Sequence, residues 1–382
     1  MRVALTHMRH AETGGTERYL NQLAAALAVS GHEVTIVCRT HGAAPHPDVR
    51  FVVRHDLAIG AGWRMWAFAK ACERHVRETP YDVVFGLGRT TTQDVLRLGG
   101  GLHATYLELA HGATLHGPER FLGRGLKHRL APMIEARALA PGAYRRIIAN
   151  SDMVKRDVIA RYAVPAHAIE TIYNGVDLER FHPRRRAAEG AELRAELGLG
   201  PEHRVVLFLG TGYGRKGLDL LLDAFPTLAR ERPEAHLVVV GFDSARPRYE
   251  ARAKALGLAQ RVTFLGGRPD AERCYAAADL YVLPTRYDPF ANSTLEALAS
   301  GLPVVTTTTN GAAEILAHRA NGSVVALADG REALAAELSF WCDPDRLRAG
   351  ADAARALAEL HSAASKMERT EALLREVADE IP

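Results

Sequence analysis

Short apolar runs alternate with longer amphipathic stretches along most of the chain. In the first half, an apolar run at residues 3–6 precedes a glycine loop, an amphipathic stretch at 17–29 and a second apolar run at 33–38. The second half repeats this order, with an apolar run at 204–209 and a glycine loop at 210–217 before the next amphipathic stretch. Each series predicts strand, helix and strand, the start of a βαβ unit. The sequence therefore predicts an α/β fold of two doubly wound domains that face a cleft.

The stretch at 284–309 carries the most chemistry. It predicts a polar loop, a short helix and a buried strand, with Asp288 on the loop and Glu296 eight positions later in the helix. A helix start offers main-chain N–H groups that suit a phosphate. Carboxylates on either side could hold a ribose diol and a sugar hydroxyl, so one nucleotide-sugar fits the stretch. The N–H groups expected at the phosphate belong to Asn292, Ser293 and Thr294.

A purely structural interpretation of the same stretch is also open. Ser293 and Glu296 have the spacing of a capping box, in which the glutamate only satisfies a backbone N–H. Asp288 followed by proline is an ordinary turn. Taken alone, the stretch slightly favours this interpretation, and the rest of the chain changes the balance.

The glycine loop at 210–217, GTGYGRKG, has the glycine spacing of a dinucleotide fingerprint. Two features favour a different phosphate ligand. Arg215 and Lys216 lie inside the loop, where cations can neutralise a pyrophosphate. The nearest acidic candidate after the next strand, Asp243, is too far along the chain for the usual spacing of about 20 residues. We therefore expect this loop to bind phosphate.

The first half holds weaker candidates. The paired Gly14 and Gly15 can let the backbone approach a ligand closely, or simply make a tight turn. His103, His111 and His116 stand among small and polar residues and could line the cleft. The basic amphipathic stretch at 119–139 could lie on an anionic membrane surface or be a solvated face. Its cations are Arg120, Arg124, Lys127 and Arg129.

Composition narrows the functional classes. Apolar residues make up 47% of the 382 residues and charged residues 24%, and the net charge is only +3, so bulk charge does not indicate a nucleic-acid binder. The four scattered cysteines suggest a reducing compartment without zinc or disulfides. The N-terminus lacks an apolar signal region, and no run approaches the roughly 20 residues that span a bilayer. We expect a cytoplasmic protein, soluble or peripheral on the membrane.

One D-x-D pair, Asp343 and Asp345, could suggest a metal-dependent transferase. It stands with Pro344 at the entrance to the last helical region, where such residues serve as cap and first turn. We therefore expect no metal and no cofactor, and we assign the cation role to Arg215, Lys216 and the helix N-terminus.

These motifs together resemble the retaining family 4 glycosyltransferases of the GT-B fold, and nearly the whole chain takes part. The resemblance is closest to the lipopolysaccharide core glucosyltransferases, through GYGRKGLD and the length. In chain order the motifs are Gly14-Gly15, NGVD at 174–177, FHP at 181–183, GRKG at 214–217, and Asp288-x7-Glu296 followed by ALASGLPVV.

The resemblance implies roles in the second half of the chain. Glu296 would hold the ribose diol, Arg215 and Lys216 the pyrophosphate, and Arg268 would lie where the family packs the base. Asp288 would orient the donor sugar. The family usually has glutamate there, so the shorter aspartate leaves the sugar contact and the sugar identity open.

In the first half, the resemblance implies that Gly15 closes over the phosphates. A histidine near the sugar is common in the family, and His111 is preferred over His116. Of the site residues, Asp288, His111 and Lys216 are expected to be catalytic. No nucleophile stands at a suitable place, so a front-face route with retention is expected.

The expected organisation is an N-terminal acceptor-side domain at 1–178, a C-terminal nucleotide-sugar domain at 179–360 and a helix at 361–382 that returns to the first domain. The expected function is transfer of a hexose, glucose from UDP-glucose, to a lipopolysaccharide-core or other lipid-linked glycan. Three alternatives stay open: a GT-B-like nucleotide-sugar epimerase, an NAD-dependent oxidoreductase, and a non-catalytic binding protein with a decayed site.

Overall fold

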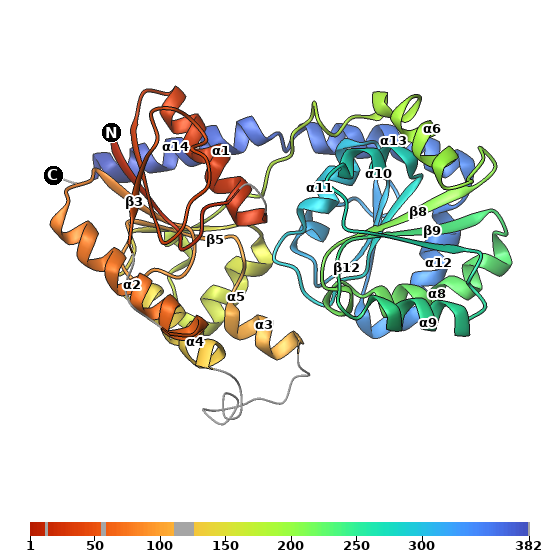
Figure 1. Cartoon of the computed structure of the whole chain (residues 1–382), viewed down its shortest axis with the longest axis horizontal. Coiled ribbons are helices and arrows are strands. Elements are labelled where there is room, and N and C mark those ends of the chain that lie inside the picture. Colours follow the sequence, from red (N-terminus) through yellow and green to blue (C-terminus); the bar gives the residue numbers. More distant parts are fainter. Residues whose placement is uncertain (12–13, 55–58, 111–125, 381–382) are drawn as a thin grey trace. The chain divides into compact units, whose positions relative to one another are not determined.

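The computed structural model describes residues 1–11, 14–54, 59–110 and 126–380. The chain divides into two compact units, coloured from red to yellow and from green to blue in Figure 1 except for the C-terminal helix. Unit 1 comprises Met1–Tyr173 and Ala364–Pro382, and unit 2 comprises Asn174–Ala363. The boundaries thus fall at 173 and 363, where the sequence suggested 178 and 360.

Within the described residues, unit 1 is built on a seven-stranded parallel sheet with the order β3-β2-β1-β4-β5-β6-β7. Val3 of β1 is in register with Val34 of β2 on one side and Val83 of β4 on the other. The strands are β1 (Arg2–Thr6), β2 (Glu33–Cys38), β3 (Arg50–Val53), β4 (Val83–Gly86), β5 (Val95–Leu98), β6 (Arg146–Ala149) and β7 (Ile169–Thr171).

Helices cover both faces of this sheet. Leu20 and Leu23 pack with Val3 and with Leu374 in one apolar core, so the first and last helices of the chain share a face. A second core includes Val154 and alternate residues of two strands that also contribute to the first, such as Leu96 beside Val95, so it lies on the opposite face. The helices of unit 1 are α1 (Gly15–Val29), α2 (Ala61–Glu78), α3 (His103–Ala110), α4 (Leu126–Ala138), α5 (Asp152–Tyr162) and α14 (Ala363–Asp379).

The C-terminal helix α14 is fixed on unit 1 by polar contacts as well as by its apolar face. The Tyr19 hydroxyl lies 3.0 Å from that of Thr370, and Arg369 donates to both carboxylate oxygens of Glu170 at 2.6 Å. A helix that follows the whole of unit 2 in sequence therefore belongs to unit 1.

Unit 2 has a parallel sheet of six strands among the residues described, in the order β10-β9-β8-β11-β12-β13. Its strands are β8 (Arg204–Leu209), β9 (Ala235–Val240), β10 (Val262–Gly266), β11 (Leu280–Leu283), β12 (Val304–Thr307) and β13 (Gly322–Val325). Its helices are α6 (Glu189–Glu196), α7 (Tyr213–Lys216), α8 (Leu218–Glu231), α9 (Arg246–Ala255), α10 (Ala271–Ala277), α11 (Asn292–Ala299), α12 (Gly330–Trp341) and α13 (Pro344–Glu359).

The predicted α/β class with two doubly wound domains is confirmed. In each sheet the strand order reverses once, between β1 and β4 in unit 1 and between β8 and β11 in unit 2. Open α/β sheets bind ligands in the crevice at the carboxyl ends of the strands beside such a reversal. Each unit therefore offers one site of this kind.

Two strands of unit 1 were missed by the sequence pattern. β3 is a short edge strand, and β5 reads Val-Leu-Arg-Leu, where Arg97 interrupts the apolar run. Arg97 is nevertheless buried, and its guanidinium lies 3.6 Å from the centre of the Tyr19 ring. Stacking on an aromatic face lets a cation occupy a buried strand position.

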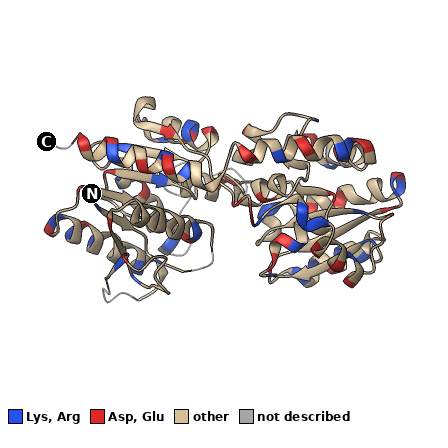
Figure 2. Cartoon of the chain, turned by 90° about the horizontal axis from the view of Figure 1, so that it is seen from above, with Lys and Arg blue, Asp and Glu red and all other residues tan. Residues whose placement is uncertain are grey.

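Acidic and basic residues are interspersed over the helices of both units (Figure 2). This arrangement fits the small net charge of +3. Among the described helices, none is long and apolar enough to cross a membrane.

Candidate functional site

The two loops that the sequence singled out meet at the strand reversal of unit 2. The loop after β8 contains Arg215, whose carbonyl oxygen accepts the N–H of Arg286 at 2.8 Å and the Thr285 hydroxyl at 3.0 Å. Gly217 ends the β8 loop with φ at +78°, and a Cβ there would lie 1.9 Å from the carbonyl oxygen of Pro284. Only glycine fits both the backbone conformation and this close approach.

The charged groups of the two loops form one buried cluster. Lys216 Nζ lies 2.5 Å from Asp288 Oδ2, and Arg215 donates to the same oxygen at 3.1 Å. Burial would raise the pKa of Asp288, but Lys216 and Arg215 outweigh burial and hold this pKa below its usual range. The cations expected at the pyrophosphate and the carboxylate expected at the sugar are thus in direct contact.

Helix α11 begins beside this cluster. Its N-cap residue is Ala291, which has no side chain able to accept from the first turn. The N–H of Thr294 donates to the Ala291 carbonyl at 3.0 Å, so the prediction that Thr294 offers a free N–H is wrong. No main-chain acceptor is recorded among the described residues for the N–H groups of Asn292 and Ser293. Two donors of the expected three therefore remain for an anion.

Asn292 also uses its side chain. Asn174 Nδ2 donates to Asn292 Oδ1 at 2.6 Å and lies 3.4 Å from the Phe290 carbonyl oxygen. Asn174 belongs to the NGVD turn that the sequence noted without a role. The turn therefore supports the start of α11.

Glu296 is held by an aromatic residue that the sequence did not suggest. The Tyr275 hydroxyl donates to Glu296 Oε2 at 2.8 Å. Tyr275 is fully buried on α10, and burial followed by Glu296 raises the pKa of its hydroxyl. Because α11 is capped at Ala291, Ser293 and Glu296 do not form a capping box, and that alternative is wrong.

Asn310 is a second residue that sequence reasoning missed. Its side chain is buried and makes four hydrogen bonds. Asn310 Oδ1 accepts from the N–H groups of Ala291 and Ala312, and Nδ2 donates to the hydroxyls of Thr294 and Thr306. It braces the loop that carries Asp288 against β12. An asparagine at a strand end was a weak signal in the sequence.

Three other charged residues that the sequence brought into question, Asp243, Asp343 and Arg268, have partners within the protein. Asp243 accepts the N–H of Tyr213 at 2.6 Å and that of Ala245 at 2.8 Å. Asp343 caps α13 by accepting the N–H groups of Asp345 and Arg346, which confirms the predicted cap. Arg268, expected near the base, makes a two-point ion pair with Asp270.

In unit 1, Gly14 is the N-cap of α1 with φ at +115°, and Gly15 is the first residue of the helix. The basic residues Lys127 and Arg129 are exposed on α4. His111, Arg120 and Arg124 lie outside the described residues, as does His116.

Two family descriptions match the chain. Residues 13–180 match Glycosyltransferase Family 4, and residues 203–343 match Glycosyl transferases group 1. D-inositol 3-phosphate glycosyltransferase 2 of Catenulispora acidiphila is 31% identical over 383 aligned positions, covering 88% of this chain and 84% of the relative. The chain belongs to glycosyltransferase family 4.

Lipopolysaccharide glucosyltransferase WaaG of Escherichia coli is 26% identical to this family 4 glycosyltransferase, over 85% of each chain. A crystal structure of WaaG, a glycosyltransferase involved in lipopolysaccharide biosynthesis, has a TM-score of 0.82 at 24% identity and covers 97% of this chain and 99% of its own. The fold is GT-B. The matches cover 80–85% of two of the first five curated relatives and 46–51% of the other three.

Proposed function

We propose that this glycosyltransferase moves glucose from UDP-glucose to a lipopolysaccharide-core or other lipid-linked glycan, with retention of configuration and without a metal ion. The observation that carries the proposal is the cluster at the strand reversal of unit 2. There Lys216, Arg215 and Asp288 meet in direct contact next to α11.

The donor would lie along the start of α11. Its pyrophosphate would take hydrogen bonds from Lys216, Arg215 and the N–H groups of Asn292 and Ser293, while Glu296 would accept from the ribose hydroxyls. Asp288 would face the sugar hydroxyls. The hydroxyl of Tyr275 holds one oxygen of Glu296, which fixes the carboxylate for a diol.

Such a site lowers the barrier by stabilising the leaving diphosphate. As the bond between the anomeric carbon and the diphosphate breaks, negative charge grows on the phosphate oxygen. The buried cations and the helix N-terminus oppose that charge without needing to reorganise. The acceptor oxygen bonds to the anomeric carbon on the same face, and its proton passes to the leaving phosphate oxygen.

The proposed identities of the donor and of the acceptor are supported by different observations. Glucose is supported by the name of the E. coli relative, and a UDP-sugar by solved structures of the same fold that are described with UDP-glucose. Other relatives are named for inositol phosphate and for mannosylfructose-phosphate synthesis, so the acceptor class varies among them. Exposed Lys127 and Arg129 support peripheral contact with an anionic membrane on the cytoplasmic face.

The test is transfer from UDP-glucose to a lipopolysaccharide-core acceptor in buffer containing EDTA, with the anomer of the product assigned by NMR. An α-linked glucoside formed without metal supports the whole proposal. UDP-galactose, GDP-mannose and ADP-glucose are assayed in parallel as donors. Faster transfer from one of them would identify it as the donor in place of UDP-glucose.

Two alternatives have specific consequences. An NAD-dependent oxidoreductase would need an acidic residue after the glycine loop that is available to bind ribose. Both carboxylate oxygens of the candidate, Asp243, instead accept main-chain N–H groups, which disfavours this alternative. An epimerase would turn over UDP-sugar at the same rate with or without a glycan. Dependence of UDP release on the acceptor therefore separates transferase from epimerase.

A further inference from the structure

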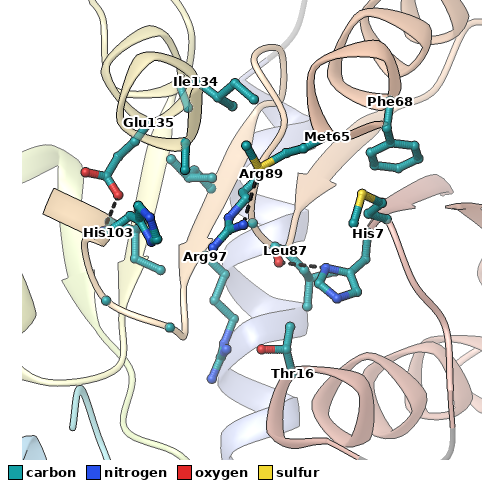
Figure 3. Close-up of a pocket in the computed structure, with 18 of the residues that line it drawn as sticks. His7, Thr16, Met65, Phe68, Leu87, Arg89, Arg97, His103, Ile134 and Glu135 are labelled. Atoms are coloured by element: carbon teal, nitrogen blue, oxygen red, sulfur yellow. Dashed lines mark hydrogen bonds between the residues drawn. The ribbon is translucent and has the colours of Figure 1, made fainter. Parts of the chain in front are cut away.

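Unit 1 contains a cavity of about 570 Å³ at the carboxyl ends of β1, β4 and β5. It lies at the strand reversal of this sheet, with α2 and α4 beside it, and Figure 3 shows the side chains around it. His7 follows β1, Arg89 follows β4, and His103 begins α3. This cavity lies in unit 1, whereas the donor cluster lies in unit 2.

The cavity carries an excess of positive charge. Three of its cations, Arg9, Arg89 and Lys127, have no carboxylate within ion-pair distance among the residues that the structure describes. Of the two acids that line it, Glu135 accepts the Tyr162 hydroxyl at 2.7 Å and the His103 N–H at 2.5 Å. Glu17 and Glu135 together cannot balance these three cations and Arg97, which also lines the cavity.

Arg89 is the central cation. In Figure 3 its side chain stands between His103 and His7. Its guanidinium donates to the sulfur of Met65 at 3.2 Å, a weak acceptor, and no stronger acceptor is recorded for it in the described part of the chain. Burial lowers the pKa of Arg89 by more than the charge of Glu135 raises it, so this cation has lost water and the nearby carboxylate only partly compensates. An anionic ligand would replace that water.

The two imidazoles next to Arg89 are neutral near pH 7. Burial lowers the pKa of His103 to about 4, with Arg89 adding to the effect, and burial also lowers the pKa of His7. His7 Nδ1 lies 3.0 Å from the Leu87 carbonyl oxygen, which can only accept, so Nδ1 carries the proton. His7 Nε2 is therefore an acceptor, suited to a hydroxyl group.

The remaining wall is apolar. Met65 and Phe68 contribute from α2, and Ile134 and Leu139 from α4 and the residues after it. A ring or a chain of carbon atoms can pack there while its charged end stays on Arg89. The cavity therefore suits an amphiphile with one anionic end.

We propose that this cavity binds a hydroxyl-bearing phosphomonoester, with its phosphate on Arg89 and Lys127 and a hydroxyl donating to His7 Nε2. Phosphate is favoured over carboxylate because it carries between one and two charges at neutral pH and has three acceptor oxygens for several cations. That this ligand is the acceptor for sugar transfer rests on the proposed function. That the cavity binds a phosphomonoester does not.

The test is calorimetric titration of the full chain with glucose 6-phosphate, glucose and hexyl phosphate. Both phosphates should bind, glucose should bind at least tenfold more weakly than glucose 6-phosphate, and Arg89→Gln should weaken both phosphates at least tenfold. Arg64→Gln is the matched control, because Arg64 is exposed on α2 and does not line the cavity. Glucose 6-phosphate should bind more tightly than hexyl phosphate, because only the sugar offers a hydroxyl to His7 Nε2, and tighter binding of hexyl phosphate would overturn the hydroxyl contact.

The inference is overturned if neither phosphate binds, or if Arg89→Gln binds both as the parent does. Lys127→Gln, exposed at the rim, provides a second variant should Arg89→Gln misfold, and it should weaken both phosphates severalfold. UDP is titrated in parallel. If the phosphates bind and UDP does not, the proposed function is wrong and the phosphate site stands. If UDP binds to the parent and to Arg89→Gln but neither phosphate binds, only the phosphate site is wrong.

Discussion

Lys216 Nζ and Asp288 Oδ2 lie 2.5 Å apart, although 72 positions separate the two residues in the chain. Both side chains are almost fully buried, at 10% and 11% exposure. The pair joins the glycine loop after β8 to the loop after β11. It links the two motifs on which the proposed donor site depends.

Asp288→Asn should therefore destabilise unit 2 as well as lower activity. Removing one partner of a buried ion pair leaves an uncompensated charge, which costs about 3–5 kcal/mol. Urea unfolding measures this loss. Asp223→Asn, which removes the partner of the more exposed Arg252, is the matched control and should have a much smaller effect. Equal losses for the two variants would contradict a special role for the buried pair.

Gly217→Ala should be far more damaging than Gly257→Ala. Both glycines have positive φ, +78° and +74°, so both variants lose about 1–2 kcal/mol from backbone strain. A Cβ at Gly217 also meets the Pro284 carbonyl oxygen at 1.9 Å, whereas a Cβ at Gly257 meets nothing within 4 Å. The thermal midpoints of the two variants check this, and similar midpoints would show that the loops are not in close contact.

Asn310→Ala should loosen the loop that carries Asp288. The change leaves the N–H groups of Ala291 and Ala312 without their side-chain acceptor, and we expect a loss of about 2–4 kcal/mol with a fall in kcat/KM. Thr308→Ala, at an exposed neighbour, is the control for local substitution. A stable Asn310→Ala protein with normal turnover would show that the brace is dispensable.

His236 gives unit 2 a stability that depends on pH. It is buried on β9, next to the Thr263 hydroxyl at 2.8 Å, and burial lowers its pKa to about 4 from an ordinary 6.5. The unfolded chain therefore takes up a proton between pH 6.5 and 4 that the folded chain does not, so the free energy of unfolding falls as pH falls through this window. Melting temperatures at pH 7 and pH 5 should differ less for His236→Gln than for the parent. An unchanged difference would mean that His236 is not responsible.

The sequence predicted the strand, glycine loop and helix of each unit because these signals are local. It could not predict that Tyr275 holds Glu296 or that Asn310 braces the Asp288 loop, since both contacts depend on which strands become neighbours. Asp288 and Lys216 were assigned to different parts of the donor for the same reason. The cavity of unit 1 draws side chains from several separate elements, and no single stretch of sequence contains its pattern.

β5 shows a different limit. A charged residue in a short apolar run normally argues against a buried strand. Here Arg97 is buried against the ring of Tyr19 on α1, a contact between residues far apart in the chain. Tertiary packing decides the local structure at this position.

The central claim is that Glu296 binds the ribose of the donor. The most direct measurement is the affinity for UDP, by calorimetry, of the parent, Glu296→Gln and the surface control Glu332→Gln. Loss of charge-assisted hydrogen bonds worth about 1.5–3 kcal/mol should weaken UDP binding roughly tenfold to a hundredfold in Glu296→Gln and leave Glu332→Gln unchanged. If Glu296→Gln binds UDP as tightly as the parent and only melts earlier, Glu296 serves Tyr275 alone and the proposed donor site is wrong.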